Sequence, residues 1–385
     1  MSYLLLPRRG DVVKWAIVPI GFAVGVLAAG LPSPGQVAEA GAVWLCLELL
    51  VYQARYQWND ICGFDTDQRH PGGDRGRLPG PSDRRRVRFA WSASTAAAKV
   101  MLALGLCAIA GSRAASAMAV LTAGVFGAAA IYERLRGVGK ADSQRPPRPT
   151  PRIVAIWVVV GAGYAIRVLA GLWLAGPFEA RAMQAAAASA WLFGIAWTTS
   201  RWAVESTAFM RLRRGRVRWT AADAEGKEHQ VALARWLPEQ VPADVRDTRS
   251  WRAVRAGTRR WSPWNVGGAL AGAMAAVSGV LLVQPAAQAG GLWLALLAGL
   301  VASWTLVASG ERREVDTAAA CAAAIAVAVL AGGSAAVAAV TPWVVVSVAQ
   351  ACYLRQDRAS IGMLVSGVRK SVRRLAAKPV LSPAR

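Results

Sequence analysis

Three polar residues at the end of an apolar stretch have side chains of the kind that bind a divalent metal. Asp67 lies seven positions after Asp60 and eight after Asn59, so the three share one face if the helix predicted over 38–58 continues past the membrane. Magnesium usually bridges one or two protein carboxylates to the phosphates of a substrate. The spacing therefore predicts a Mg²⁺ site with Asn59, Asp60 and Asp67 as ligands. A solvated helix end capped by Asn and Asp is the alternative.

The same face continues upstream into the bilayer through Glu48, Tyr52 and Tyr56. Ionisable groups at membrane depth are costly, and they usually face the interior of a bundle or a wet cavity. We therefore interpret this face as the wall of a polar pocket and include Tyr56 among the substrate-binding candidates.

Basic residues downstream of the carboxylates could hold phosphate oxygens. Arg75 and Arg77 have planar guanidinium groups that match phosphate geometry, although arginines near a span also anchor its cytoplasmic end. His70 precedes a proline, so it could orient a phosphate or form the turn that ends the helix. These three residues are candidates for substrate binding.

Charged residues of the later spans need partners. Arg167 lies in the middle of a predicted span, where an unpaired guanidinium is costly. It must meet a phosphate, a carbonyl or a carboxylate, and an ion pair with Glu48 is the structural alternative to a catalytic role. Arg201 and Glu205 lie on adjacent turns of one helix end, where a simple ion pair is again the alternative to roles in substrate binding and catalysis.

Tyr132 and Arg136 lie at the cytoplasmic end of another predicted span. They could close the pocket and bind substrate, although arginines that extend toward the headgroups are ordinary at this depth.

The composition predicts an all-α polytopic membrane protein. Of the 385 residues, 55% are hydrophobic and 17 are Trp, and the apolar residues form runs close to the ~20 residues that a bilayer crossing needs. We predict ten spans, near 13–31, 37–57, 89–111, 115–132, 152–176, 181–203, 264–284, 290–308, 316–332 and 334–354.

The net charge of +23 is a topology signal rather than the mark of a nucleic-acid partner. Lys and Arg concentrate in the even-numbered loops and in both tails, which places these segments and both termini in the cytoplasm, with the bundle in the cell membrane. The five cysteines show no paired spacing and only two histidines exist, which argues against a disulfide framework and a His-rich metal centre.

The predicted domain organisation is one bundle over 1–354 with a cytoplasmic segment inserted at 205–262. Within this insert, the pattern of 216–220 and 230–234 around Glu225-Gly226 predicts a short hairpin or a small cytoplasmic subdomain. The tail, 355–385, has apolar residues at helical spacing opposite basic ones. This pattern is typical of an amphipathic helix lying on the inner leaflet.

The pattern Asn59-Asp60-x-x-Gly63-x-x-x-Asp67 resembles the first aspartate-rich motif of the UbiA-type intramembrane prenyltransferase superfamily, which also stands at the cytoplasmic end of the second span. The resemblance covers roughly residues 10–210. In the detail of its motifs the chain is most similar to the branch that includes decaprenyl-phosphate phosphoribosyltransferases, through Gln68–Pro71, Arg75–Pro79, Tyr132, Arg167–Gly171 and Arg201–Glu205. It departs from the family at Gly63, which replaces a third acidic residue, and in a second acidic motif reduced to Glu205.

The resemblance implies a bundle of nine to ten helices around a central cavity, and a transferase that displaces diphosphate with the help of Mg²⁺. The substrate would be an isoprenoid diphosphate or a polyprenyl phosphate lipid. Asp60 and Asp67 would hold the metal, Arg75, Arg77 and Arg201 the phosphate oxygens, and Arg167 a second anionic group. Two alternatives remain: a terpene cyclase on the same fold, and a non-catalytic membrane interaction protein in which the altered motifs have abolished the chemistry.

Overall fold

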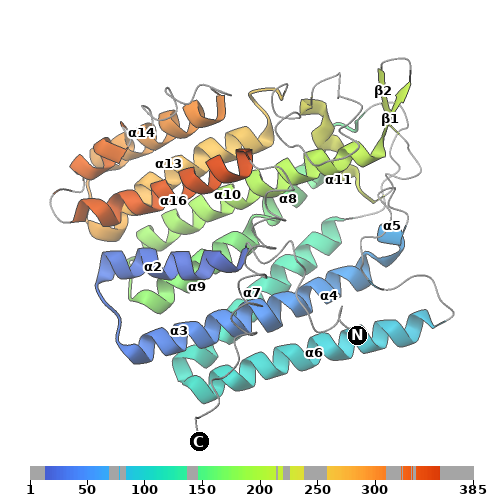
Figure 1. The fold of residues 1–385 in the computed structure, drawn as a ribbon, viewed down its shortest axis with the longest axis horizontal. Helices are drawn as coiled ribbons and strands as arrows, with labels where there is room; N and C mark the ends of the chain where they lie inside the picture. The colour runs from blue at the N-terminus through green and yellow to red at the C-terminus, as the bar shows by residue number, and fades with distance from the viewer. Residues whose placement is uncertain are drawn as a thin grey trace, which may run out of the picture.

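The computed structural model of the chain describes residues 14–68, 78, 84–136, 146–213, 216–219, 226–237, 258–308, 322, 324–330, 332 and 335–355. These residues form helices and one small hairpin (Figure 1). The first half of the chain contains α2 (Ile17–Ala29), α3 (Pro34–Cys46), the π-helical turn η2 (Leu47–Val51), α4 (Tyr52–Cys62), α5 (Phe64–Gln68), α6 (Arg85–Ala110), α7 (Ser112–Leu135), α8 (Pro151–Val159) and α9 (Ala162–Ala175). The second half contains α10 (Ala180–Glu205), the 3₁₀ turn η3 (Ser206–Phe209), β1 (Met210–Arg213), β2 (Arg216–Trp219), α11 (Glu228–Val231), the 3₁₀ turn η5 (Ala232–Trp236), α13 (Pro263–Val283), α14 (Ala289–Ala308) and α16 (Ala336–Arg355).

Six helical segments of the described residues are long and apolar enough to cross a bilayer, and they fit an integral membrane protein. They are Pro34–Cys62, Arg85–Ala110, Ser112–Leu135, Pro151–Ala175, Pro263–Val283 and Ala289–Leu306. Lys14–Ala29 and Ala336–Gln350 are apolar but shorter. The helix α10 has 26 residues, enough to cross a bilayer, but it is not among the six apolar segments. Most of the predicted span 316–332 and almost all of the tail 355–385 lie outside the described residues. The count of nine to ten spans therefore stays a prediction.

Local sequence signals define where several helices begin and end. Ser33 and Gln36 form a capping box before α3, in which the Ser33 hydroxyl accepts from the Gln36 amide and the Gln36 side chain accepts from the Ser33 amide. The Thr150 hydroxyl caps α8 by accepting from the Ile153 amide, and a proline occupies the first position of both helices. Gly111 is the one residue between α6 and α7, and its backbone has a φ of 142°. Glycine adopts this conformation with little steric strain.

The helices run side by side, and α13 lies at the centre of one half of the bundle. It packs against α10, α14 and α16 (Figure 1), and small residues on all of its faces let these neighbours approach closely. The outer helices α6 and α14 instead leave large apolar side chains uncovered, including Trp91, Met101, Ile109 and Trp293. Apolar side chains on an outer face are what contact with lipid requires.

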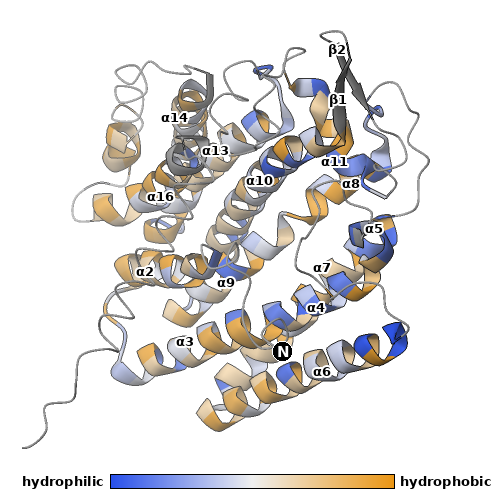
Figure 2. Ribbon diagram, turned by 45° about the vertical axis from the view of Figure 1, so that its right-hand side comes forward, coloured by the Kyte–Doolittle hydropathy of each residue, from blue (hydrophilic) through white to orange (hydrophobic). Residues whose placement is uncertain are grey.

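Polar structure gathers at one end of the bundle. In Figure 2 the hydrophilic residues concentrate near α5, α11 and the first turns of α6. The β1–β2 hairpin lies at the same end in Figure 1. The predicted hairpin is wrong in its pairing. Arg216–Trp219 pairs with Met210–Arg213, whereas 230–234 lies in α11 and η5. Two residues, Arg214 and Gly215, connect β1 to β2, and so short a connection closes at a lower entropic cost than the longer loop that the prediction required.

Candidate functional site

A polar cavity of about 240 Å³ lies among α4, α7, α9 and α10. Six cationic side chains are among its lining residues: Lys14, Arg55, Arg136, Arg167, Arg201 and Lys227. Among the residues that the structure describes, Glu205 is the only carboxylate of the lining. Cationic side chains therefore predominate among the charged residues of the lining.

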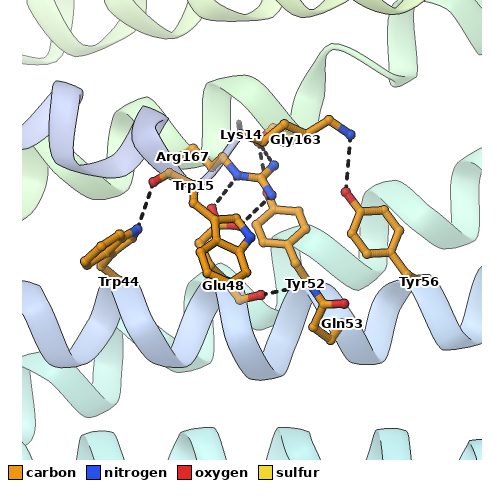
Figure 3. Close-up of polar contacts among 9 residues, drawn as sticks. All are labelled: Lys14, Trp15, Trp44, Glu48, Tyr52, Gln53, Tyr56, Gly163 and Arg167. Carbon is orange, nitrogen blue, oxygen red and sulfur yellow. Dashed lines mark hydrogen bonds and ion pairs between the residues drawn. The ribbon is translucent and has the colours of Figure 1, made fainter. Parts of the chain in front are cut away.

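The deepest charged group of the cavity is held by an ion pair. Arg167 of α9 donates from Nε and Nη2 to the two carboxylate oxygens of Glu48, at 2.5 and 2.9 Å (Figure 3). Both side chains are at most 3% exposed. The third guanidinium nitrogen donates to the carbonyl oxygen of Gly163, and the guanidinium lies 3.4 Å from the centre of the Tyr52 ring. The structural alternative for Arg167, an ion pair with Glu48, is thus present in the structure, and a carboxylate is the partner that this buried guanidinium needs.

The π-helical turn η2 positions Glu48. A π turn hydrogen-bonds from residue i+5 back to residue i, and the Tyr52 amide donates to the Leu47 carbonyl in this way. The Gln53 side-chain amide donates to the carbonyl of Glu48 (Figure 3), which gives that carbonyl a partner inside the apolar helix. The local widening of the helix thus lies beside the ion pair, as is common at functional sites.

Two aromatic hydroxyls continue the polar face along α4. The Tyr52 hydroxyl donates to the Gly163 carbonyl at 2.9 Å. One turn later, the Tyr56 hydroxyl accepts from the Lys14 ammonium at 3.4 Å (Figure 3), and the Arg55 guanidinium lies 5.2 Å from the centre of the same ring. Tyr56 therefore lies between two cations of the lining.

Two ion pairs hold arginines of the cavity lining. Arg136 pairs with Glu133 at 2.9 Å, and Arg201 pairs more loosely with Glu205 at 3.7 Å. Tyr132 and Trp202 lie between these pairs, with ring centres 6.4 Å apart. The structure thus brings Tyr132, Arg136, Arg201 and Glu205 to the cavity with Tyr56, Asn59 and Arg167.

Residues 226–237, which we call the cap segment, border the cavity. Its apolar residues, Val231, Ala232, Leu233, Ala234 and Leu237, are buried in one cluster with Trp157, Phe209 and Trp264. The Trp157 indole donates to the His229 carbonyl at 2.7 Å. Lys227 and Gln230 of the cap segment reach the cavity lining.

Burial of His229 predicts a pH-dependent stability. Burial, with the Lys227 and Arg136 cations nearby, holds the pKa of His229 well below its usual 6.5, so the folded ring stays neutral. The ring lies 3.4 Å from the Tyr132 hydroxyl and packs against Trp202. Below about pH 6.5 the imidazole is protonated in the unfolded chain but stays neutral in the folded protein. The free energy of unfolding therefore decreases as the pH is lowered.

Thermal unfolding in detergent should therefore show a melting temperature that falls between about pH 7 and pH 5, with a smaller fall in His229→Gln. Carboxylates titrate alike in both proteins, so the difference between the profiles isolates the imidazole. Identical profiles would contradict the prediction.

The three predicted metal ligands do not share one surface. Asn59 lines the cavity, whereas Asp60 is buried at 2% exposure and is not one of the lining residues. Adjacent residues of a helix point about 100° apart, so the predicted common face is divided between them. Asp67 lies beyond a break at Gly63, in α5, and its Oδ1 is 2.7 Å from the Lys227 ammonium.

The arrangement of Asn59, Asp60 and Asp67 does not fit a single magnesium ion. Within the described ranges, no group of three or more His, Cys, Asp or Glu side chains is arranged to hold a metal. The Lys227 ammonium already contacts the Asp67 carboxylate, so the chemistry proposed below contains no step that uses magnesium. His70, Arg75 and Arg77 lie outside the described residues, and their substrate-binding roles stay predictions.

A second cavity, of about 130 Å³ and almost wholly apolar, lies among α2, α9, α10, α13 and α16. Its walls include Ile20, Val24, Leu172, Phe193 and Val346. Tyr164 lines both cavities, so the two spaces meet the same side chain.

Several lining residues were not predicted from the sequence. Lys14 precedes an apolar run and resembles any positive flank of a span. Lys227 lies in a loop with many basic residues, and Arg55 is one of many arginines near a cytoplasmic helix end. Tyr164 had a weak signal, since an aromatic hydroxyl in an apolar span needs a partner.

Comparisons of the chain with protein-family models, with curated proteins and with solved structures find no match. The chemistry of the cavity is therefore the basis for a functional proposal.

Proposed function

We propose that this protein is an intramembrane transferase that binds the phosphate or diphosphate group of an isoprenoid lipid in the cationic cavity. The transfer would join the isoprenoid or polyprenyl group to an acceptor with loss of diphosphate. The observation that carries the proposal is the set of six cationic side chains in the described lining. They outnumber the four carboxylates that pair with them, which are Glu48, Asp67, Glu133 and Glu205. Guanidinium and ammonium groups bind phosphate oxygens through charge-assisted hydrogen bonds.

The two cavities together suit an amphiphilic substrate. A phosphorylated head group matches the cationic cavity, and a hydrocarbon chain matches the apolar one, which Tyr164 also lines. Placing both parts on one protein would hold the bond between them near Tyr164. Fixing a reacting bond in this way removes part of the entropic barrier to reaction.

The residues suit the departure of diphosphate. The bond between the first isoprenoid carbon and the diphosphate oxygen breaks, and its electron pair leaves with the diphosphate, whose new charge the surrounding cations stabilise. The rings of Tyr52, Tyr56, Tyr164 and Trp197 line the cavity, and aromatic faces stabilise a developing carbocation. The acceptor forms a bond to that carbon and loses a proton, which Glu205 can accept.

A non-catalytic lipid-binding protein is the second candidate. The observation that favours it is the ion pair between Lys227 and Asp67, which occupies a carboxylate of the motif on which the enzymatic resemblance depends. Such a protein would bind the same phosphorylated lipid and leave it unchanged.

The test measures binding of inorganic diphosphate and release of diphosphate from isoprenoid diphosphates of several lengths, with and without acceptors, by the detergent-purified protein. Lys14→Gln and Arg201→Gln should each weaken binding and slow release about tenfold, since a hydrogen bond to a charged group contributes about 1.5–3 kcal/mol. Arg113→Gln is the matched control, because Arg113 contacts Trp173 and does not line the cavity.

The outcomes separate the candidates. Release that depends on an acceptor supports the transferase, and release without an acceptor favours a terpene cyclase. Binding without release favours the non-catalytic protein. If inorganic diphosphate does not bind, or if Arg113→Gln weakens its binding as much as Arg201→Gln does, the cationic cavity is not the anion site.

A further inference from the structure

The cap segment brings a fixed cation to the acidic motif. Lys227 Nζ lies 2.7 Å from Asp67 Oδ1, and the two side chains are 5% and 4% exposed. Water therefore contributes little to neutralising this carboxylate, and the ammonium is a close, permanent counter-ion.

The backbone on both sides favours this contact. Gly226 has a φ of 74°, and a Cβ at this position would lie 3.1 Å from the Thr66 side chain. Glycine adopts this φ at little cost and lets the turn approach α5 closely. The Gly226 amide also donates to the Glu228 side chain. This turn sets Lys227 beside Asp67, and the buried residues of the cap segment hold the turn in place.

A second cation occupies the space beside residue 63. A Cβ on Gly63 would lie 2.9 and 3.1 Å from the two terminal nitrogens of Arg136, so the guanidinium stands where a larger side chain would project. Arg136 is held there by Glu133 at 2.9 Å. The motif therefore has an arginine against its third position and a lysine against its last carboxylate.

We infer that Lys227 replaces a divalent metal as the counter-ion of Asp67, so that the cationic cavity binds its anion without a metal at the aspartate motif. A divalent ion next to Asp67 would have to displace the ammonium and would be repelled by Arg136. Lys227 also lines the cavity, so one residue joins the acidic motif to the anion site. The part of this inference that concerns the anion rests on the proposed function; the part that concerns the metal does not.

The experiment titrates Mn²⁺, followed by its electron paramagnetic resonance, into the full-length detergent-purified protein. Wild type and Asp67→Asn should bind Mn²⁺ equally, because Asp67 is not a ligand. Lys227→Met exposes the carboxylate to a metal and should bind Mn²⁺ at least about tenfold more tightly, and Lys227→Met/Asp67→Asn should lose this gain. Lys227→Arg keeps the cation and should behave as wild type does.

Tighter Mn²⁺ binding by wild type than by Asp67→Asn would overturn the inference, and this comparison holds even if Lys227→Met fails to fold. A folded Lys227→Met with no gain in Mn²⁺ binding would also overturn it, since Lys227 would then not be what excludes the metal.

A second measurement uses inorganic diphosphate, titrated into wild type in EDTA and in Mg²⁺. Equal affinity supports the inference, and a Mg²⁺ requirement that disappears in Asp67→Asn overturns it. Absence of diphosphate binding in both conditions would reject the proposed function alone, because the Mn²⁺ titrations still decide whether Lys227 occupies the place of a metal.

Discussion

Glu48→Leu is expected to destabilise the folded protein by about 3–5 kcal/mol, the usual cost of removing one partner of a buried ion pair. Arg167 would keep its charge at 2% exposure and would lose both hydrogen bonds to the carboxylate. The Gly163 carbonyl and the Tyr52 ring would remain as its described contacts, and neither carries a negative charge. Leucine has a similar volume to glutamate, so the loss reports the charge rather than a void.

The unfolding free energy can be measured by denaturant titration in mixed micelles. Glu48→Leu/Arg167→Met should recover much of the loss, because it removes both charges and leaves an apolar contact. Glu179→Leu is a control, since Glu179 is exposed and its side chain caps no helix. A double variant no more stable than Glu48→Leu would show that the loss does not come from the uncompensated guanidinium.

Gly171→Leu should separate α2 from α9 and destabilise the protein by about 1–3 kcal/mol or more. A Cβ at Gly171 would overlap the Val18 carbonyl oxygen and the Phe22 amide nitrogen. Both obstacles are backbone atoms, which cannot move aside as a flexible side chain can. Because Lys14 lies just before α2 and Arg167 lies in α9, and both line the cavity, the same substitution should weaken binding of inorganic diphosphate.

Gly105→Leu is the matched control for this prediction. Gly105 lies within a membrane-length helix, α6, and a Cβ there would have no neighbour within 4 Å. Thermal unfolding in detergent should therefore show a much lower melting temperature for Gly171→Leu and little change for Gly105→Leu. A similar drop in melting temperature in both variants would mean that replacing glycine by leucine destabilises the helix itself. The contact between α2 and α9 would then not be the cause.

The sequence predicted the long apolar helices well because their signal is local. A run of about 20 apolar residues is recognisable without any knowledge of its neighbours. The predicted spans 89–111 and 264–284 match Arg85–Ala110 and Pro263–Val283 to within a few residues. The sequence also indicated that Arg167 needs a partner, and Glu48 was named as one alternative because ionisable groups are few at membrane depth.

The candidate site was only half predictable. Tyr56, Asn59, Tyr132, Arg136, Arg167, Arg201 and Glu205 do line one cavity, as an inward-facing polar face suggests. Asp60 does not line it, because its side chain points about 100° away from that of Asn59 on the same helix. Asp67 does not line it either, because helical periodicity describes the faces of one straight helix and α4 ends before Gly63. A break of this kind changes the direction of every residue after it.

The sequence by itself determined that the chain forms long apolar helices with polar residues gathered near one end, since hydrophobicity and charge act over a few turns. Only the tertiary structure decided that Lys227, 160 residues beyond Asp67, supplies its counter-ion, and that Lys14 and Tyr164 belong to the cavity. The reason is physical: contacts between distant segments depend on how whole helices pack, and a basic residue in a loop has the same local pattern whether it faces water or a buried carboxylate.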